Sequence, residues 1–370
     1  MKAIRALEKL QNFKLLPVFV LVSMALGIGI GKIYAISDFA LTPPIDAIKA
    51  IVRGEYSFTL PNTLALGVVA GLFLMMYPAM TNIRFEDLGK AVRSKKQLFT
   101  VLFFNFAIAP FLMYGLANLF FKPGSDFHTA LVLYGLAPCI AMVIVFTFLA
   151  FGNSALAIVL VAMNSILQMA LIPVYAHWLL GEVSFDVWVV AESVVLYLGA
   201  PLAAGIATRR WGMRKYGEEG FKKVKSFLDT LSIFGLLFTL VVMFALKGDL
   251  IVGQPQIIFQ LAVPMTLFFW TMFIGVYLAG WKLGFDYKDA VAVAFNSTGR
   301  DFEIAIAIAI TAFNPTVALA TVVGPLIEVP VMLVLVWFAR RTQERLFAPA
   351  SPVLEPELES EKRLGQRRNS

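Results

Sequence analysis

The chain has 370 residues, of which 59% are hydrophobic and only 15% are charged, and its formal net charge is +7. This composition excludes an ordinary soluble domain, because runs of about 20 apolar residues, the length that crosses about 30 Å of hydrocarbon, recur along the chain. We therefore expect a multi-pass membrane protein.

Ten apolar runs are predicted to cross the membrane as helices joined by short connections. The first run follows Lys2, Arg5 and Lys9, but it stays apolar for about 20 residues, longer than the core of a secretory signal. We therefore predict that it is a retained span. The ten runs cover residues 14–35, 62–82, 97–121, 127–150, 155–179, 187–208, 226–247, 255–280, 289–311 and 317–339.

Lysine and arginine are distributed very unevenly between the two sides of these spans. If both termini are cytoplasmic, 25 of the 31 Lys and Arg residues lie on the cytoplasmic side, as the retention of positive loops inside the cell requires. We predict a cell-membrane protein whose basic segments contact anionic lipid, and not nucleic acid. Residues 1–13 are then a cytoplasmic N-terminus. Residues 342–370, which mix proline with both signs of charge, are expected to be a disordered cytoplasmic tail.

Two similar stretches indicate an internal repeat. The sequence reads FGNSALAIVLV from Phe151, between the fourth and fifth spans, and FNPTVALATVV from Phe313, about 162 residues later, between the ninth and tenth. The spans then divide into two halves of five, residues 14–180 and 187–341. Because five is odd, the second half enters the membrane from the opposite side. The predicted fold is therefore an all-α membrane protein with ten transmembrane helices in two inverted repeats, an architecture typical of transporters.

Substrate sites in such folds lie near the midplane, where broken helices expose backbone groups. Gly135, Pro138 and Cys139 interrupt the fourth span, since Pro138 disfavours a continuous helix. Shifting by the repeat offset places Cys139 opposite residues 301–303. The residues that interrupt the apolar sequence of the ninth span are Asn296, Ser297, Thr298, Gly299, Arg300, Asp301 and Glu303.

The charges of the ninth span have two readings. An Arg or Asp at the centre of a span costs about 2.5–3.5 kcal/mol and so rarely persists without a partner or a role. Arg300 and Glu303 are three residues apart and can form a purely structural ion pair, and other polar side chains can cap a broken helix. Six polar residues and a glycine among the eight residues 296–303 exceed what one ion pair needs, which favours a substrate or proton site.

Glu328 lies in the tenth span, flanked by Pro325 and Pro330, with no compensating charge nearby in the sequence. Carboxylates of this kind often carry protons in transporters, although a structural pair with Arg300 across the spans is the alternative. Asn164 falls close to the equivalent position in the first half, where it can hydrogen-bond across the helix interface.

Other kinds of site are absent from the sequence. His128 and His177 lack the spacing of metal ligands, and no phosphate-binding glycine loop or hydrolase serine motif occurs. We expect no metal, no cofactor and no enzyme activity. Transport would be driven by an ion gradient or by a partner ATPase, because the chain has no nucleotide-binding domain. Cys139, the single cysteine, cannot form an internal disulfide and is either a small buried hydrophobe or a soft ligand.

Four stretches, GLAPCIAMVIV from Gly135, VLVAMNSI from Val159, DFEIAIAIAI from Asp301 and ALATVVGPLIEVPVMLVLVWF from Ala318, together resemble the arsenite efflux permeases of the bile acid/sodium symporter superfamily. The resemblance implies a core domain of spans 3–5 and 8–10, with crossed fourth and ninth helices, and a second domain of the other four spans. It also implies extrusion of trivalent arsenic, as arsenite and sometimes antimonite, in exchange for protons. Cys139 and Glu328 are the functional residues that it implies.

One departure affects the expected substrate. The family usually presents neutral amides before its Phe-Glu pair, whereas Arg300 and Asp301 stand there in this chain. A fixed cation suits an anion better than neutral arsenous acid, so a sodium- or proton-coupled symporter of an organic anion, held by Arg300, remains an alternative, as does a receptor that does not transport. The predicted groups are Cys139, Asn296, Arg300 and Asp301 for substrate, Glu328 and Glu303 for protons, and Pro138, Gly135, Asn164 and Gly299 in support.

Overall fold

The computed structural model of the protein describes residues 16–34, 53, 60–81, 94–140, 142–181, 183, 185–253 and 256–347. Every regular element within these ranges is a helix, which confirms the all-α prediction; the predicted N-terminal segment 1–13 lies outside them. The elements are α2 (Leu16–Tyr34), α4 (Leu60–Met80), α6 (Lys95–Leu102), η2 (Phe103–Ile108), α7 (Ala109–Phe120), α8 (Asp126–Leu136), α9 (Met142–Leu149), α10 (Ser154–Leu179), α11 (Val187–Val194), η3 (Val195–Gly199), α12 (Ala200–Gly253), α13 (Gln256–Lys282), α14 (Tyr287–Thr298), α15 (Phe302–Ala312), α16 (Pro315–Val322) and α17 (Gly324–Leu346).

Large apolar side chains cover the outer surface of the helices. Trp188, Leu119 and Phe259 are each about three-quarters exposed, at 77%, 75% and 74%, a pattern expected of a surface that faces lipid and costly for one that faces water. Four continuous helical stretches among the described residues are long and apolar enough to cross a membrane, namely Lys95–Phe120, Ser154–Leu179, Val187–Phe221 and Ile258–Lys282.

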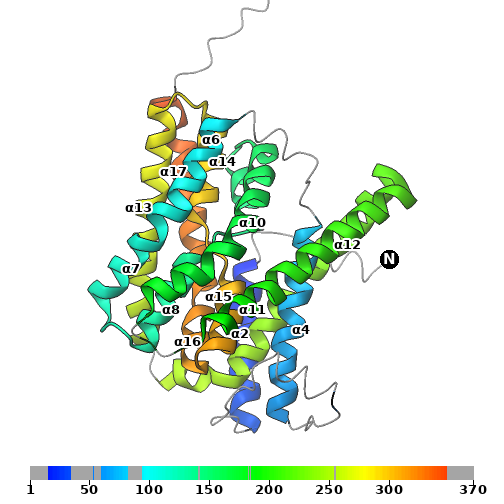
Figure 1. Ribbon diagram of the computed structural model, residues 1–370, viewed down its shortest axis with the longest axis vertical. Helices are drawn as coiled ribbons and strands as arrows, with labels where there is room; N and C mark the ends of the chain where they lie inside the picture. The colour runs from blue at the N-terminus through cyan, green and yellow to red at the C-terminus, as the bar shows by residue number, and fades with distance from the viewer. Residues whose placement is uncertain are drawn as a thin grey trace, which may run out of the picture.

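The sixth and seventh predicted spans are joined differently from the prediction. A connecting loop was expected between residues 208 and 226, but α12 is helical through this basic segment and projects past the other helices at one end (Figure 1). Only Gly217 departs from helical geometry, with φ 65° and ψ −175°. Glycine adopts such a positive φ without the steric cost that a Cβ would bring, so the chain bends there. Near the C-terminus the chain is also helical further than predicted, because α17 continues to Leu346. The expected disordered tail was predicted to begin at residue 342, and its residues after 347 lie outside the described residues.

The helices gather into two groups in space (Figure 1). In one group, α12 packs along α2 and α4, with glycines at the closest approach. A Cβ on Gly235 of α12 would lie 2.8 Å from the backbone nitrogen of Met75 on α4, and one on Gly27 of α2 would lie 2.5 Å from the carbonyl oxygen of Val241. Small residues of this kind let membrane helices pack backbone to backbone. The second group contains α6 to α10 and α13 to α17, which pack mainly on one another.

The two repeat motifs occupy matching places in the structure. Asn153 caps the start of α10, and Asn314 caps the start of α16. The Asn153 amide also donates a 2.8 Å hydrogen bond to Asp289 in the first turn of α14, while the Asn314 amide donates one of 2.7 Å to Asp126 in the first turn of α8. Each motif therefore starts one helix and holds the beginning of a helix in the other half of the sequence.

Candidate substrate site at two broken helices

The structure contains both helix breaks that the sequence indicates. Helix α8 ends at Leu136 and α9 begins at Met142, so Pro138 lies within the first break. The second break separates α14 from α15 and contains Gly299 to Asp301. Proline removes one backbone donor from the first break, and a non-helical backbone at membrane depth must satisfy its remaining groups within the protein.

The two breaks satisfy each other through an antiparallel bridge between Pro138 and Arg300. The backbone N–H of Cys139 donates to the carbonyl of Gly299 at 3.0 Å, and the N–H of Asp301 donates to the carbonyl of Ala137 at 2.8 Å. Pro138 and Arg300 are separated in sequence by the same interval as Phe151 and Phe313. At this interval Cys139 corresponds to Asp301 and Ala137 corresponds to Gly299, so the two hydrogen bonds are equivalent in the two halves of the sequence.

Cys139 is buried, with 4% of its surface exposed, and its thiol is free. Gly299 lies directly beside it, since a Cβ on Gly299 would be 3.1 Å from the Cβ of Cys139 and 3.4 Å from the Oε1 atom of Glu328. The predicted thiol, glycine and glutamate therefore meet at one point, although they lie in three different segments of the chain.

Glu328, on α17, is completely buried. Its Oε2 atom accepts a hydrogen bond of 2.5 Å from the hydroxyl of Tyr134, and its Oε1 atom accepts one of 3.2 Å from the backbone N–H of Arg300. Tyr134 was not predicted as a site residue. The available signal was its place directly before Gly135 in the interrupted span.

The guanidinium of Arg300 forms neither of the two ion pairs that were the structural alternatives, with Glu303 and with Glu328. In the part of the chain that the structure describes, this guanidinium forms no ion pair and lies over the ring of Phe268, 5.3 Å from its centroid. The broken helices supply carbonyl acceptors that satisfy it instead. It donates to the carbonyl oxygens of Thr298 (3.2 Å), Gly135 (3.3 Å) and Ser297 (2.5 Å) and to the Oδ1 atom of Asn105 (2.6 Å).

Asn105 and Asn296 form a second polar link in this region. Asn105 lies in the π-helical turn η2, and its amide donates to the carbonyl of Asn296 at 3.0 Å while its Oδ1 atom receives Arg300. Such π-turns often occur at functional sites. The side chain of Asn296 donates within its own helix, to Ala292, and its buried Oδ1 atom has no partner among the described residues.

Asn164 is fully buried, but the interface hydrogen bond predicted for it is not formed. Neither polar atom of its amide has a partner within the described ranges, and the same is true of Gln168 one helical turn later. These two amides lie on α10, which packs against α8, α9 and α14.

Asp301 and Glu303 stand at the start of α15. Asp301 is its N-cap, and Oδ1 accepts a hydrogen bond of 3.2 Å from the backbone N–H of Ile304. A carboxylate here satisfies an otherwise unpaired N–H and interacts favourably with the helix dipole. Glu303 follows in the first turn and is half-buried. The capping role foreseen for some polar side chains thus falls to Asp301.

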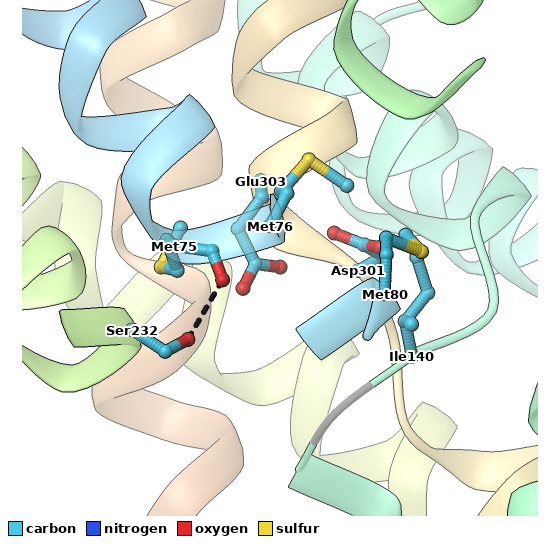
Figure 2. Close-up of a pocket in the computed structure, with 7 residues that line it drawn as sticks. All are labelled: Met75, Met76, Met80, Ile140, Ser232, Asp301 and Glu303. Carbon is cyan, nitrogen blue, oxygen red and sulfur yellow. Dashed lines mark hydrogen bonds between the residues drawn. The ribbon is translucent and has the colours of Figure 1, made fainter. Parts of the chain in front are cut away.

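A cavity of about 20 Å³ lies where these two carboxylates face α4 and α12 (Figure 2). This volume holds about one water molecule. The first break contributes Ile140, the neighbour of Cys139, and Ser232 of α12 anchors the α4 wall by donating to the carbonyl of Met75 at 2.7 Å. The lining residues are Met75, Met76, Met80, Ile140, Ser232, Asp301 and Glu303.

Comparison with known protein sequences shows the family of the chain. Residues 69–254 match the sodium bile acid symporter family. The chain is 33% identical over 357 residues to the arsenical-resistance protein Acr3 of Corynebacterium glutamicum, covering 92% of both chains. It is 34% identical over 346 residues to the Acr3 protein of Alkaliphilus metalliredigens, covering 89% of this chain and 92% of the relative.

A third relative, described as an uncharacterized transporter of Synechocystis sp., is 35% identical over 366 residues, with 92% of each chain covered. These matches extend over nearly all of the described helices, including both breaks. The chain therefore belongs to the sodium bile acid symporter family, as a membrane transporter related to the arsenical-resistance proteins.

Proposed function

We propose that the protein is a secondary active transporter that extrudes trivalent arsenic, as arsenite and also antimonite, across the cell membrane in exchange for protons. The observation that carries this proposal is the meeting of Cys139, Gly299 and Glu328 where two broken helices are joined. Two relatives that cover nine-tenths of the chain and are named for arsenical resistance support it.

The architecture that we propose has ten spans in two inverted halves, residues 14–180 and 187–341, with both termini in the cytoplasm. The paired backbone hydrogen bonds at the breaks support this, as do the two asparagine caps that each bind the other half. In this proposal α2, α4 and α12 belong to one domain, and the broken helices and their neighbours form the other.

Cys139 is the proposed ligand for the substrate. Trivalent arsenic binds thiols, and a cysteine binds metals and metalloids as the thiolate. One sulfur atom, unlike three, binds weakly enough to release its substrate, which transport requires. Asn296, whose Oδ1 atom lacks a partner among the described residues, and Asp301 are the proposed polar groups. Arg300 contributes through its backbone N–H, which holds Glu328, because its guanidinium already makes four hydrogen bonds.

Glu328 is the proposed proton carrier, with Glu303 as a second carboxyl group on the cavity wall. Protonation of the carboxylate and occupancy by substrate are alternatives in this mechanism, so that each turns the site toward the opposite side of the membrane. One charge that enters through 100 mV yields about 2.3 kcal/mol, and a tenfold gradient of a neutral solute costs about 1.4 kcal/mol. One proton therefore supports a gradient of about fortyfold.

The cavity also implies movement during transport. A space of about 20 Å³ admits a water molecule, whereas arsenous acid has four non-hydrogen atoms. In the proposed cycle the wall that carries Met75, Met76 and Met80 separates from the wall that carries Asp301 and Glu303, and the substrate enters between them.

Counterflow in proteoliposomes tests this function. Purified protein is reconstituted without ATP, and arsenite movement is measured against imposed proton and sodium gradients, with protein-free liposomes as the control. We expect arsenite flux that follows the proton gradient. No arsenite flux under any gradient would overturn the proposal. Flux that appears only with a partner ATPase and ATP would replace the proton exchange by a pump.

A symporter of an organic anion is the second candidate, because the family is named for sodium and bile acid. In this alternative Arg300 holds the anion. The guanidinium has five N–H groups, of which four are already donated to protein oxygens, so one is left. The same proteoliposomes, given taurocholate and a sodium gradient, test this alternative, and we expect no uptake.

A further inference from the structure

The guanidinium of Arg300 lies in a cage of neutral oxygen atoms at the ends of the two broken helices. Gly135 is in the last turn of α8, and Ser297 and Thr298 are in the last turn of α14. Their carbonyl oxygens accept three of the four hydrogen bonds of the guanidinium, and the amide oxygen of Asn105 accepts the fourth. Arg300 itself is fully buried.

This set of ligands is one that a monovalent metal ion would also use. The last carbonyls of a helix have no partner within that helix and carry its partial negative charge. In transporters with broken helices, such carbonyls and half-helix C-termini coordinate coupling ions such as Na⁺. The guanidinium forms no ion pair with any carboxylate of the described residues. Its positive charge is therefore stabilised in the same way, by the oriented dipoles of neutral oxygen acceptors.

The surroundings keep the cage closed. The ring of Phe268 covers the guanidinium, with its centroid 5.3 Å from the central carbon, which is an arrangement that favours a cation. The guanidinium is part of the Arg300 side chain and is therefore linked covalently to the second break. The backbone N–H of the same residue donates a hydrogen bond to Glu328. The positive charge therefore cannot dissociate from the second break as a free ion can.

We propose that the Arg300 side chain is a tethered cation that occupies the position of a coupling sodium ion, and that this protein consequently transports without sodium. The inference rests on the proposed transport function and deepens it, because it assigns the choice of coupling ion to one side chain. Removing the guanidinium should leave an oxygen cage that a free monovalent metal ion can fill.

The test compares the melting temperature of detergent-purified protein in sodium chloride and in choline chloride at equal ionic strength. We expect the same melting temperature in both salts for the unchanged chain. Arg300→Ala should melt at least about 3 °C higher in saturating sodium than in choline, because an ion that binds only the folded state stabilises it. Arg300→Lys, which refills the cage with an ammonium group, should again be insensitive to sodium.

Arg340→Ala is the matched control, since Arg340 is exposed on α17 and lies over the ring of Phe151; it should not respond to sodium. Arg300→Gln, whose side chain fills more of the cage, should also melt at a higher temperature in sodium than in choline. A variant that is monodisperse in sodium but aggregates in choline supports the proposal, and one recovered in neither salt counts against it, because sodium then does not replace the guanidinium.

Two further outcomes would overturn the inference: stabilisation of the unchanged chain by sodium, or arsenite flux that needs a sodium gradient. The melting experiment contains no arsenite. A failure of the arsenite proposal would therefore leave the sodium result interpretable, and the two can be told apart.

Discussion

The hydroxyl of Tyr134 on α8 donates a hydrogen bond of 2.5 Å to Glu328 on α17. The other carboxylate oxygen of Glu328 accepts the backbone N–H of Arg300 in the second break. Glu328 is therefore hydrogen-bonded both to α8, which ends at the first break, and to the backbone of the second break. Any change in its protonation changes the contacts between them.

Replacing Glu328 by glutamine tests the proton-coupling role. Glutamine keeps the size of the side chain but cannot carry the proton, so we expect arsenite flux to lose its dependence on a proton gradient. Flux is measured in proteoliposomes at several pH values on either side of neutrality. If the arsenite flux of the variant depends on pH as strongly as that of the unchanged chain, the proposed role of Glu328 is refuted.

Tyr134→Phe is the companion change, because it keeps the carboxylate and removes one of its two donors. Loss of a buried hydrogen bond to a charged group should cost about 1–3 kcal/mol of unfolding free energy. We expect slower flux with a displaced pH profile, rather than complete loss. An unchanged profile would indicate that Tyr134 serves only packing against Gly324, which its ring contacts closely.

The thiol of Cys139 is tested by Cys139→Ser and Cys139→Ala. The bridge between the breaks uses the backbone N–H of Cys139, which both variants keep, so we expect the melting temperature to change little. Arsenite flux should fall by about tenfold or more, which corresponds to about 1.4 kcal/mol of lost interaction with the substrate. Full flux in both variants would return Cys139 to the role of a small buried hydrophobe.

Gly299→Ala should damage the crossing of the broken helices. The added Cβ would lie 2.4 Å from the Cγ1 atom of Val143 and 3.1 Å from the Cβ of Cys139. Overpacking of this kind costs about 1–3 kcal/mol, and we expect loss of flux together with a lower melting temperature. Gly115→Ala in α7 is the control, because a Cβ there meets nothing within 4 Å; equal damage in both variants would contradict the crowding argument.

Capping and charge can be separated at the start of α15. Asp301→Asn keeps an oxygen for the N-cap bond and should retain stability, whereas Asp301→Ala should lose about 1 kcal/mol. Glu303→Gln removes a charge from the cavity wall without removing a cap, so we expect altered flux at unchanged melting temperature. The proposal for Glu303 fails if its variant transports normally at every pH tested.

The helix breaks could be predicted because their causes are local. Pro138 removes a donor from the first break, and Gly299 and its polar neighbours interrupt an apolar run at the second. The direction of the Arg300 side chain could not be predicted in the same way. Its long side chain has carboxylates nearby in sequence, but two of the acceptors that it binds instead, the carbonyl oxygen of Gly135 and the amide oxygen of Asn105, are 165 and 195 residues away.

Two further differences have similar causes. The segment between residues 208 and 226 was expected to be a connection because it lies between two apolar runs. Arg, Lys and Glu are nevertheless good helix formers, and only Gly217 departs from helical geometry there. The partnership of Asn105 with Arg300 depends on the π-turn η2. A wide turn of this type leaves no clear signature in the residues that form it.

Because the chain has a single cysteine, chemical labelling of that residue can report on the accessibility of the site. Cys139 is 4% exposed and stands beside the junction of the broken helices, so a membrane-impermeant maleimide can react with the protein at one position only. The rate of alkylation from each face of the bilayer therefore measures how often the junction becomes accessible to that face. No engineered label is needed to count these openings.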